Sequence, residues 1–577
     1  MRFVSVVLLS LGLVIGLSAQ VPQWTQMATD GPNDYLAADS TFNQFTRDLL
    51  VGSDLDHDGR PEIIVTDYKD GGRVHVFEVV GPDSIQEVWT YIGPGYPTYQ
   101  PARSVAVGDL DGDSLPEIIL AKSGASGDTS IDWVGLWVFE WDGVPGSDNY
   151  GIDGQPTDRY IEFLRDTAGN LPNQMRAEDI VVADFDGDGQ QEVLWVNNAA
   201  TVYDNAYIVS IVGDIGGFSY DVLEAIFRRT EMGLGGSTNG AYGPLDLDGD
   251  GNLEGIIGVW NRGAFVIFEA TGPDAYELKY IVQGLDETDL YPCNKISGIY
   301  DYDNDGRDEF FYSGEYWHNF AHGIYIVNVD GDDIDSSTVH IDTLPVDPAV
   351  YGLDGMSVGD VDGDGNWDIY LLTSVTTGAW GWRYNGGAVN DPSNYTIYPI
   401  LPEVFEYAET VIVDTDTVIY RFHPAITIKP TNDLDGDGYA EVVFTVYEVS
   451  SNENYPYLPW NTGFLRIAEY TPQGVEEWTV LPPKGSVPEL YAAAPSPFAR
   501  FTNIGFFIPK RGNVSLKVYD IRGRLVKTLY SGELDAGKYS FRWDGTDMGG
   551  KKVANGVYIY RLETEFGSLA KRVILTK

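Results

Sequence analysis

An acidic nine-residue motif recurs along the chain and constrains the fold more than any other feature. It reads Asp-x-Asp-x-Asp-x-x-x-Asp/Glu, and its seven copies begin at Asp54, Asp109, Asp184, Asp246, Asp301, Asp360 and Asp433. Successive copies start 55 to 75 residues apart, which is the length of one four-stranded β-unit with its loops. The spacing therefore predicts seven repeats of a small β-structure.

The acids of each motif suit a hard divalent cation. Ca²⁺ binds about six to eight oxygen ligands, so we expect side chains at positions 1, 3, 5 and 9 and the backbone carbonyl of position 7 to converge on one ion. Glycine at position 6 permits a positive φ. The second copy has Ser114 there, so we expect it to bind most weakly.

The predicted ligands are the acids at positions 1, 3, 5 and 9 of each copy, which imply about seven Ca²⁺ sites. They are Asp54, Asp56, Asp58 and Glu62; Asp109, Asp111, Asp113 and Glu117; Asp184, Asp186, Asp188 and Glu192; Asp246, Asp248, Asp250 and Glu254; Asp301, Asp303, Asp305 and Glu309; Asp360, Asp362, Asp364 and Asp368; and Asp433, Asp435, Asp437 and Glu441.

The sequence around each motif favours strands over helices. Residues 104–107 (Ser-Val-Ala-Val) precede the second copy and residues 118–120 (Ile-Ile-Leu) follow it, as β-rich runs do. An EF-hand differs, because its loop lies between helices and closes with an acid at position 12. Each motif is therefore predicted to join two adjacent strands. The alternative is a set of solvated acidic turns.

The repeated loops resemble the FG-GAP (VCBS-type) repeat of integrin α-subunit propellers and of many bacterial surface proteins, over about residues 45–480. The resemblance implies a seven-bladed β-propeller with calcium in the loops between the first two strands of each blade. The segment near Pro22 to Met27 is predicted to close the ring by completing the last blade.

The last part of the chain has a different pattern. Residues 514–520 alternate as a half-buried strand, and Trp543-Asp544-Gly545, Gly556-Val557-Tyr558 and a basic terminal strand follow. The strand spacing predicts a small β-sandwich. It resembles the FlgD-type Ig-like and type IX secretion C-terminal sorting domains, and a generic Ig-like stalk is the alternative.

We therefore predict an all-β chain with four parts: a signal peptide at 1–20, a propeller at 21–480, a linker at 481–494 and an Ig-like sorting or anchoring domain at 495–577. The first part has Arg2 followed by an apolar run that ends at Ala19, as in secretory signals. No later segment is apolar enough to span a membrane. The protein is thus expected to be secreted or held at a bacterial cell surface, in contact with the secretion or surface machinery.

The net charge and the aromatic residues indicate which class of molecule the protein binds. The formal net charge of −51 repels nucleic acid, which is therefore not an expected partner. Aromatic residues in the predicted loops between the second and third strands suggest a glycan- or protein-binding face. They are Trp260, Tyr316, Trp317, Trp380, Trp382, Tyr455, Tyr457 and Trp460.

The sequence favours a binding or adhesion protein over an enzyme, because no catalytic motif and hence no catalytic residue is found. The alternative function is a secreted polysaccharide-degrading enzyme, a lyase or glycosidase, on a calcium propeller scaffold. Packing between blades is the alternative role for the aromatic side chains.

Overall fold

The computed structural model describes residues 23–26, 46–67, 73–81, 84–92, 102–122, 134–165, 177–197, 205–232, 237–260, 264–282, 292–302, 306–314, 323–346, 353–361, 365–373, 378–400, 408–413, 416–450, 465–471, 479–481, 488–490, 493, 498, 500–508, 510–534, 537–565 and 567–576. The predicted signal peptide lies outside them. These residues form two compact units, one of residues 1–85 and 89–480 and one of residues 86–88 and 481–577. Within the described part of the chain, no helix is long and apolar enough to cross a bilayer.

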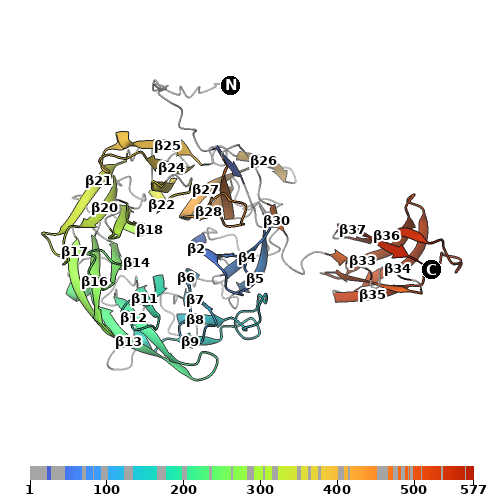
Figure 1. The fold of residues 1–577 in the computed structure, drawn as a ribbon, viewed down its shortest axis with the longest axis horizontal. Coiled ribbons are helices and arrows are strands. Elements are labelled where there is room, and N and C mark those ends of the chain that lie inside the picture. The colour runs from blue at the N-terminus through green and yellow to red at the C-terminus, as the bar shows by residue number, and fades with distance from the viewer. Residues whose placement is uncertain are drawn as a thin grey trace. The chain divides into compact units, whose positions relative to one another are not determined.

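The first unit contains seven antiparallel sheets of four or five strands (Figure 1). Sheet 1 has the order β2 (Thr46–Ser53), β3 (Glu62–Asp67), β4 (Arg73–Gly81), β5 (Ser84–Ile92), β30 (Thr479–Leu481). Sheet 2 comprises β6 (Ala102–Gly108), β7 (Glu117–Lys122), β8 (Gly135–Glu140) and β9 (Asp158–Tyr160). Sheet 3 comprises β10 (Ala177–Ala183), β11 (Glu192–Asn197), β12 (Ala206–Gly213) and β13 (Ser219–Phe227).

The next three sheets repeat this up-and-down order. Sheet 4 comprises β14 (Ser237–Leu245), β15 (Glu254–Trp260), β16 (Ala264–Gly272) and β17 (Ala275–Val282). Sheet 5 comprises β18 (Pro292–Tyr300), β19 (Glu309–Gly314), β20 (Gly323–Val329) and β21 (Val339–Pro345). Sheet 6 comprises β22 (Leu353–Gly359), β23 (Asp368–Thr373), β24 (Gly378–Tyr384) and β25 (Tyr395–Pro399). The described helices are α1 (Arg229–Met232) and two single 3₁₀ turns, Glu162–Leu164 and Pro392–Asn394.

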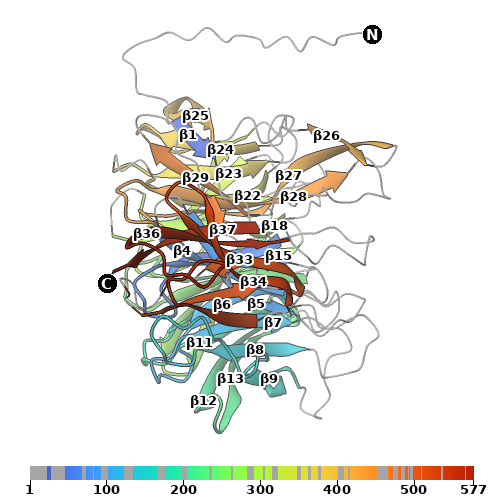
Figure 2. The same cartoon turned by 90° about the vertical axis from the view of Figure 1, so that its right-hand side faces the viewer.

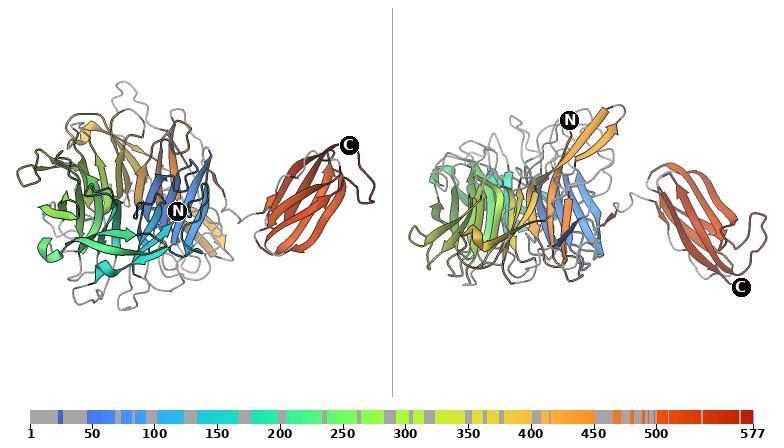
Figure 3. Two further views of the ribbon diagram at one scale, coloured as in Figure 1. Left: turned by 60° about the horizontal axis from the view of Figure 1, so that its bottom comes forward. Right: turned by 90° about the horizontal axis from the view of Figure 1, so that it is seen from above.

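Sheet 7 draws its strands from both ends of the unit. Its order is β1 (Gln23–Gln26), β29 (Leu465–Thr471), β28 (Glu441–Ser450), β27 (Asp416–Pro430), β26 (Ala408–Val413). The pairing of β1 with β29 confirms that the segment near Pro22 to Met27 completes the last sheet. The hairpin of β26 and the first half of β27 extends beyond the rest of the sheet (Figures 2 and 3).

The first strands of the sheets contact one another in chain order. The sequence of contacts is β2, β6, β10, β14, β18, β22 and β27, and a contact between β27 and β2 closes the circuit. All six residues of β7 are buried, whereas β13 and β17 consist of half-buried and exposed residues except for the last residue of each, which is buried. This difference arises because a middle strand is covered on both faces, while an outer strand is covered on one.

A chain of polar contacts joins four of these first strands. The Asp48 carboxylate of β2 accepts hydrogen bonds from the Ser104 hydroxyl at 2.6 Å and the Val105 N–H at 3.0 Å, both on β6. Ser104 also lies 2.8 Å from the Asp179 carboxylate of β10, which in turn accepts the Ala241 N–H of β14 at 3.2 Å. Ser104 is fully buried, so these contacts fix the spacing of neighbouring sheets away from water.

The second unit has two antiparallel sheets. One has the order β31 (Glu489–Leu490), β32 (Thr502–Ile508), β35 (Gly537–Trp543), and the other β34 (Leu525–Leu534), β33 (Gly512–Asp520), β36 (Gly556–Thr564), β37 (Gly567–Leu575). Both sheets contribute to one apolar core around the fully buried Trp543, whose Nε1–H donates to the Thr546 carbonyl at 3.0 Å. Strand β31 falls inside the segment predicted as a linker.

Substituting Ser104→Ala should destabilise the first unit by about 1–3 kcal/mol, because it removes the hydroxyl that joins β2, β6 and β10 in a buried position. Urea unfolding followed by tryptophan fluorescence measures this change. The control is Ser337→Ala on the exposed turn before β21, which should change the free energy of unfolding by less than about 0.5 kcal/mol. Equal effects of the two substitutions would contradict the bracing role of Ser104.

Candidate metal sites

The seven acidic motifs form the connections between the first two strands of the seven sheets. We call them loops 1 to 7; each lies between the strands of one pair, namely β2 and β3, β6 and β7, β10 and β11, β14 and β15, β18 and β19, β22 and β23, and β27 and β28. Position 9 is in every case the first residue of the second strand. The predicted placement of the motifs between adjacent strands is therefore confirmed.

Each loop is wound around its first aspartate. In all seven loops a carboxylate oxygen of position 1 accepts the backbone N–H of position 6, at 2.9 to 3.5 Å. Position 6 has a positive φ throughout, including 73° at Ser114. Position 6 therefore favours glycine because its φ is positive, as predicted. Loop 2 adopts the same turn with Ser114, although a residue with a side chain rarely takes a positive φ.

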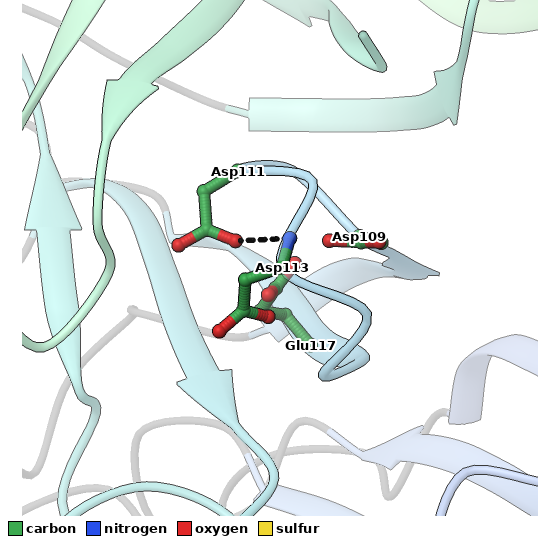
Figure 4. A group of neighbouring side chains, drawn as sticks. All are labelled: Asp109, Asp111, Asp113 and Glu117. Carbon is green, nitrogen blue, oxygen red and sulfur yellow. Dashed lines mark hydrogen bonds between the residues drawn. The ribbon is translucent and has the colours of Figure 1, made fainter. Parts of the chain in front are cut away.

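Positions 3 and 5 turn their carboxylates inward in the same way. In loop 2 the Asp111 carboxylate accepts the Asp113 N–H at 3.3 Å, and the Asp113 carboxylate accepts the Leu115 N–H at 2.7 Å (Figure 4). The corresponding bonds form in loops 1, 3, 4 and 7. Each carboxylate uses one oxygen for the backbone, which leaves its second oxygen available to another partner.

The acid at position 9 is buried in every loop, with at most 2% of its surface exposed. In six loops one of its oxygens accepts the N–H of position 2, for example Leu110 to Glu117 at 2.7 Å and Leu247 to Glu254 at 2.6 Å. The other oxygen, Oε1, is buried without a hydrogen-bond partner in Glu62, Glu117, Glu254 and Glu441. A buried carboxylate oxygen without a donor is costly, so these atoms fit the ligand set of a cation.

The acids of a loop come close enough together to share one ion. One carboxylate oxygen from each of the four acids lies within 4.8 Å of the others in loops 2, 3 and 7, and the same holds for Asp54, Asp56 and Asp58 of loop 1. Oxygen is the ligand that hard divalent cations prefer. In loops 5 and 6 the central acids Asp303, Asp305, Asp362 and Asp364 lie outside the described residues.

When no cation is bound, burial and repulsion between neighbouring carboxylates raise the pKa of several loop acids. Burial first, and then the neighbouring carboxylates, raise the pKa of Glu62, Glu192 and Glu441 to about 8, and that of Glu117 and Glu254 to about 9. The pKa of Asp56 rises to about 6 for the same reasons. Protons and cations therefore compete for the same oxygens.

Loop 6 ends differently because its ninth residue is the shorter Asp368. Its carboxylate accepts hydrogen bonds from the hydroxyls of Tyr398 at 3.1 Å and Tyr370 at 3.3 Å. Both hydroxyls come from the strands of the same sheet, and burial and the nearby Asp368 raise the pKa of both tyrosines. The closing acid of loop 6 is thus held by two tyrosine side chains of its own sheet.

The following sheet braces three of the loops. The second oxygen of Asp111 in loop 2 accepts the Ile215 N–H at 2.7 Å, from the turn between β12 and β13. That of Asp186 in loop 3 accepts the Asp274 N–H at 2.6 Å, from the turn between β16 and β17. In loop 1 the carbonyl of Asp56 accepts the Gly146 N–H at 3.0 Å. The loops therefore lie at the boundaries between sheets.

One set of acids near the loops was missed by the motif. A glutamate on the third strand stands directly opposite the ninth residue in four sheets: Glu78 opposite Glu62, Glu140 opposite Glu117, Glu269 opposite Glu254, and Glu469 opposite Glu441. Three of them follow a phenylalanine near the end of an apolar run. That recurring Phe-Glu pair was the available sequence signal.

The aromatic residues predicted for a ligand face are only partly described. Trp380 and Trp382 lie on strand β24, not in a loop, so their predicted position is wrong. Trp382 is 2% exposed and belongs to the core shared by sheets 4, 5 and 6, and Trp380 packs against that core. Trp260 ends strand β15, while Tyr316, Trp317, Tyr455, Tyr457 and Trp460 lie outside the described residues.

Two parts of the chain match known families. Residues 54–120, which include loops 1 and 2, match the FG-GAP-like repeat. Residues 509–568, which include most of the second unit, match the FlgD Ig-like domain. No curated protein matches the sequence.

Two solved structures from Porphyromonas gingivalis are similar at low level. PorZ, an essential bacterial surface component of the type-IX secretion system, is 12% identical over 96% of this chain and 100% of its own, with a TM-score of 0.22. Dimeric latent PorU is 12% identical over 56% of this chain, with a TM-score of 0.15, and the chain spans 31% of its length. These TM-scores are too low to establish a shared fold.

Without divalent cations, the protein should become less stable as pH rises from about 5 to 9. The closing glutamates have an ordinary pKa of 4.5 but folded values of about 8 to 9. The folded state therefore holds protons that the unfolded state releases above 4.5, and this stabilisation is lost as pH passes through 8 to 9. Melting temperatures in excess chelator at pH 5, 7 and 9 measure it, and a rising series would contradict it.

Substituting Trp382→Ala should lower the free energy of unfolding by about 3–5 kcal/mol, because it empties a large buried volume in the core. The comparison is Phe218→Ala in the turn between β12 and β13, where the side chain is 80% exposed and the expected loss is below about 0.5 kcal/mol. Denaturant unfolding of both variants measures the difference. A ligand-binding role for Trp382 would instead give a stable variant with lost binding.

Proposed function

We propose that loops 1 to 7 bind about seven Ca²⁺ ions and that these ions stabilise the first unit. The observation that carries the proposal is the buried Oε1 atom of Glu62, Glu117, Glu254 and Glu441, which has no hydrogen-bond donor. An ion in the loop would supply the missing partner and offset the repulsion among the loop acids. Seven divalent ions would also reduce the formal net charge from −51 to −37.

We further propose that the first unit is a seven-bladed β-propeller. Seven antiparallel sheets with an up-and-down strand order support this, as does the closed circuit of contacts among their first strands. The match of residues 54–120 to the FG-GAP-like repeat agrees with the proposal. So does the pairing of β1 with β29, which completes one sheet from both ends of the unit.

We infer that the protein acts outside the cell, as a secreted or surface-held binding or adhesion protein. The apolar run after Arg2 supports export, and the FlgD Ig-like match supports a sorting or anchoring role for the second unit. A glycan or a protein is the proposed ligand, held by the aromatic residues of the connections between second and third strands. The candidates that remain are Trp260 at the end of β15, Tyr316, Trp317, Tyr455, Tyr457 and Trp460.

Removing calcium should lower the melting temperature sharply. Each ion that binds only the folded protein stabilises it by about 2.7 kcal/mol when calcium is present at a hundred times its dissociation constant. Differential scanning calorimetry in calcium and in excess EGTA measures the change, with excess magnesium as the control for ionic strength. Identical melting curves in calcium and in chelator would refute the calcium proposal.

A glycan array probed with the full chain, with and without calcium, tests the binding role. We expect calcium-dependent binding that is lost in the double variant Trp317→Ala, Trp460→Ala and kept in Phe218→Ala. Circular dichroism in calcium should show that all three proteins are folded. Binding that survives the double variant would refute the assignment of the ligand to these aromatic residues.

A further inference from the structure

Each glutamate on a third strand stands opposite the closing acid of its loop, so two negative charges can repel each other there. The sheets differ in the group that lies near this pair. Cross-strand partners point to the same face with their Cβ atoms about 4.5–5.5 Å apart, and like charges in this arrangement are destabilising. Glu62 and Glu78, Glu117 and Glu140, and Glu254 and Glu269 are such partners. Since Glu62, Glu117 and Glu254 are buried, each pair needs either a bound proton or a nearby positive charge to offset this repulsion.

In sheets 1 and 4 the protein supplies that charge itself. The Arg60 guanidinium, at position 7 of loop 1, pairs with the Glu78 carboxylate. The Lys279 ammonium lies 3.2 Å from a Glu269 oxygen and 2.9 Å from an Asp333 oxygen of the next sheet. The second glutamate of each pair is therefore neutralised by a side chain.

In the described part of sheet 2, no basic side chain pairs with the second glutamate. Position 7 of loop 2 is Leu115, and the fourth strand begins with Asp158. No lysine or arginine of the described ranges pairs with Glu140, and the charges that act on it most are those of Asp113 and Asp111. The charged groups that act most on this pair are thus all acidic.

Both glutamates of sheet 2 present a buried oxygen without a donor. Glu117 is fully buried, and its Oε1 has no hydrogen-bond partner. The Oε2 atom of Glu140 is buried and equally without a partner. Glu117 points toward Asp113 within loop 2 (Figure 4), and its register with Glu140 places the second carboxylate beside it.

We propose that Glu140 is a further carboxylate ligand of the divalent cation in loop 2. This inference rests on the proposed calcium binding of the loops and adds a ligand that lies outside the nine-residue motif. The cation would take the place that Arg60 and Lys279 occupy in sheets 1 and 4. Because five carboxylates attract the ion more strongly than four, loop 2 is not the weakest site, despite Ser114.

Calcium titration of the full chain against a chromophoric chelator tests the proposal, with Glu140→Gln as the variant. We expect the number of bound ions to stay the same and one of them to bind about 10-fold more weakly or worse. The matched control is Glu162→Gln, which removes one charge from the same sheet at a side chain that is 63% exposed. All ions should bind this control as they bind the unchanged protein.

Three outcomes separate the possibilities. If Glu140→Gln titrates like Glu162→Gln, the inference is wrong while the calcium proposal stands. If Glu140→Gln lacks one ion and Glu117→Gln lacks a different one, Glu140 belongs to a separate site and the inference is again wrong. If the unchanged protein binds no calcium, the proposed function fails, and the inference fails with it. Circular dichroism at saturating calcium verifies folding, and Glu140→Asp should restore part of the affinity.

Discussion

In six of the seven loops, the hydrogen bond between the carboxylate of the ninth residue and the N–H of the second is the interaction on which the rest of the first unit depends. It ties the first residue of one strand to the start of the preceding loop, as Glu117 does to Leu110. The bond holds a carboxylate at a buried position, where an uncompensated negative charge is costly. Strand pairing and loop shape thus depend on the same side chain.

The loops also connect one sheet to the next. Asp111 and Asp186 each use one oxygen inside their own loop and the other for a backbone N–H of the following sheet. Ser104 performs a similar role at the inner strands, between Asp48 and Asp179. Since neighbouring sheets share these polar contacts, a change in the structure of one loop would also weaken the contacts between its sheet and the next.

Much of this architecture could be predicted from the sequence because the motif is local. Seven motifs with the same internal spacing of acids, each followed by an apolar run, were enough to place every loop between two strands. The second unit was recognisable from alternation, and residues 509–568 match the expected Ig-like family. Local patterns succeed where hydrogen bonds join residues that are close in the chain.

The failures involve partners that are distant in the chain or hidden by strand register. Trp380 and Trp382 looked like loop residues, yet they lie two residues apart on β24, so both point to the same face of the strand, toward the core of sheets 4, 5 and 6. Glu140 could not be predicted from the motif, because it lies outside the nine residues and only the pairing of β7 with β8 places it opposite Glu117. Nothing in the spacing of residues 111 and 215 suggests that a carboxylate and an N–H meet there.

The pairing of β1 with β29 brings two segments from opposite ends of the first unit side by side in one sheet. Gln23 stands opposite Thr471, and residues opposite one another in an antiparallel pair have Cα atoms only about 5 Å apart. A short linker could therefore join these two positions, and the chain could be opened at another connection between sheets. The order of the seven sheets along the gene would then be one of several permutations compatible with the same set of contacts.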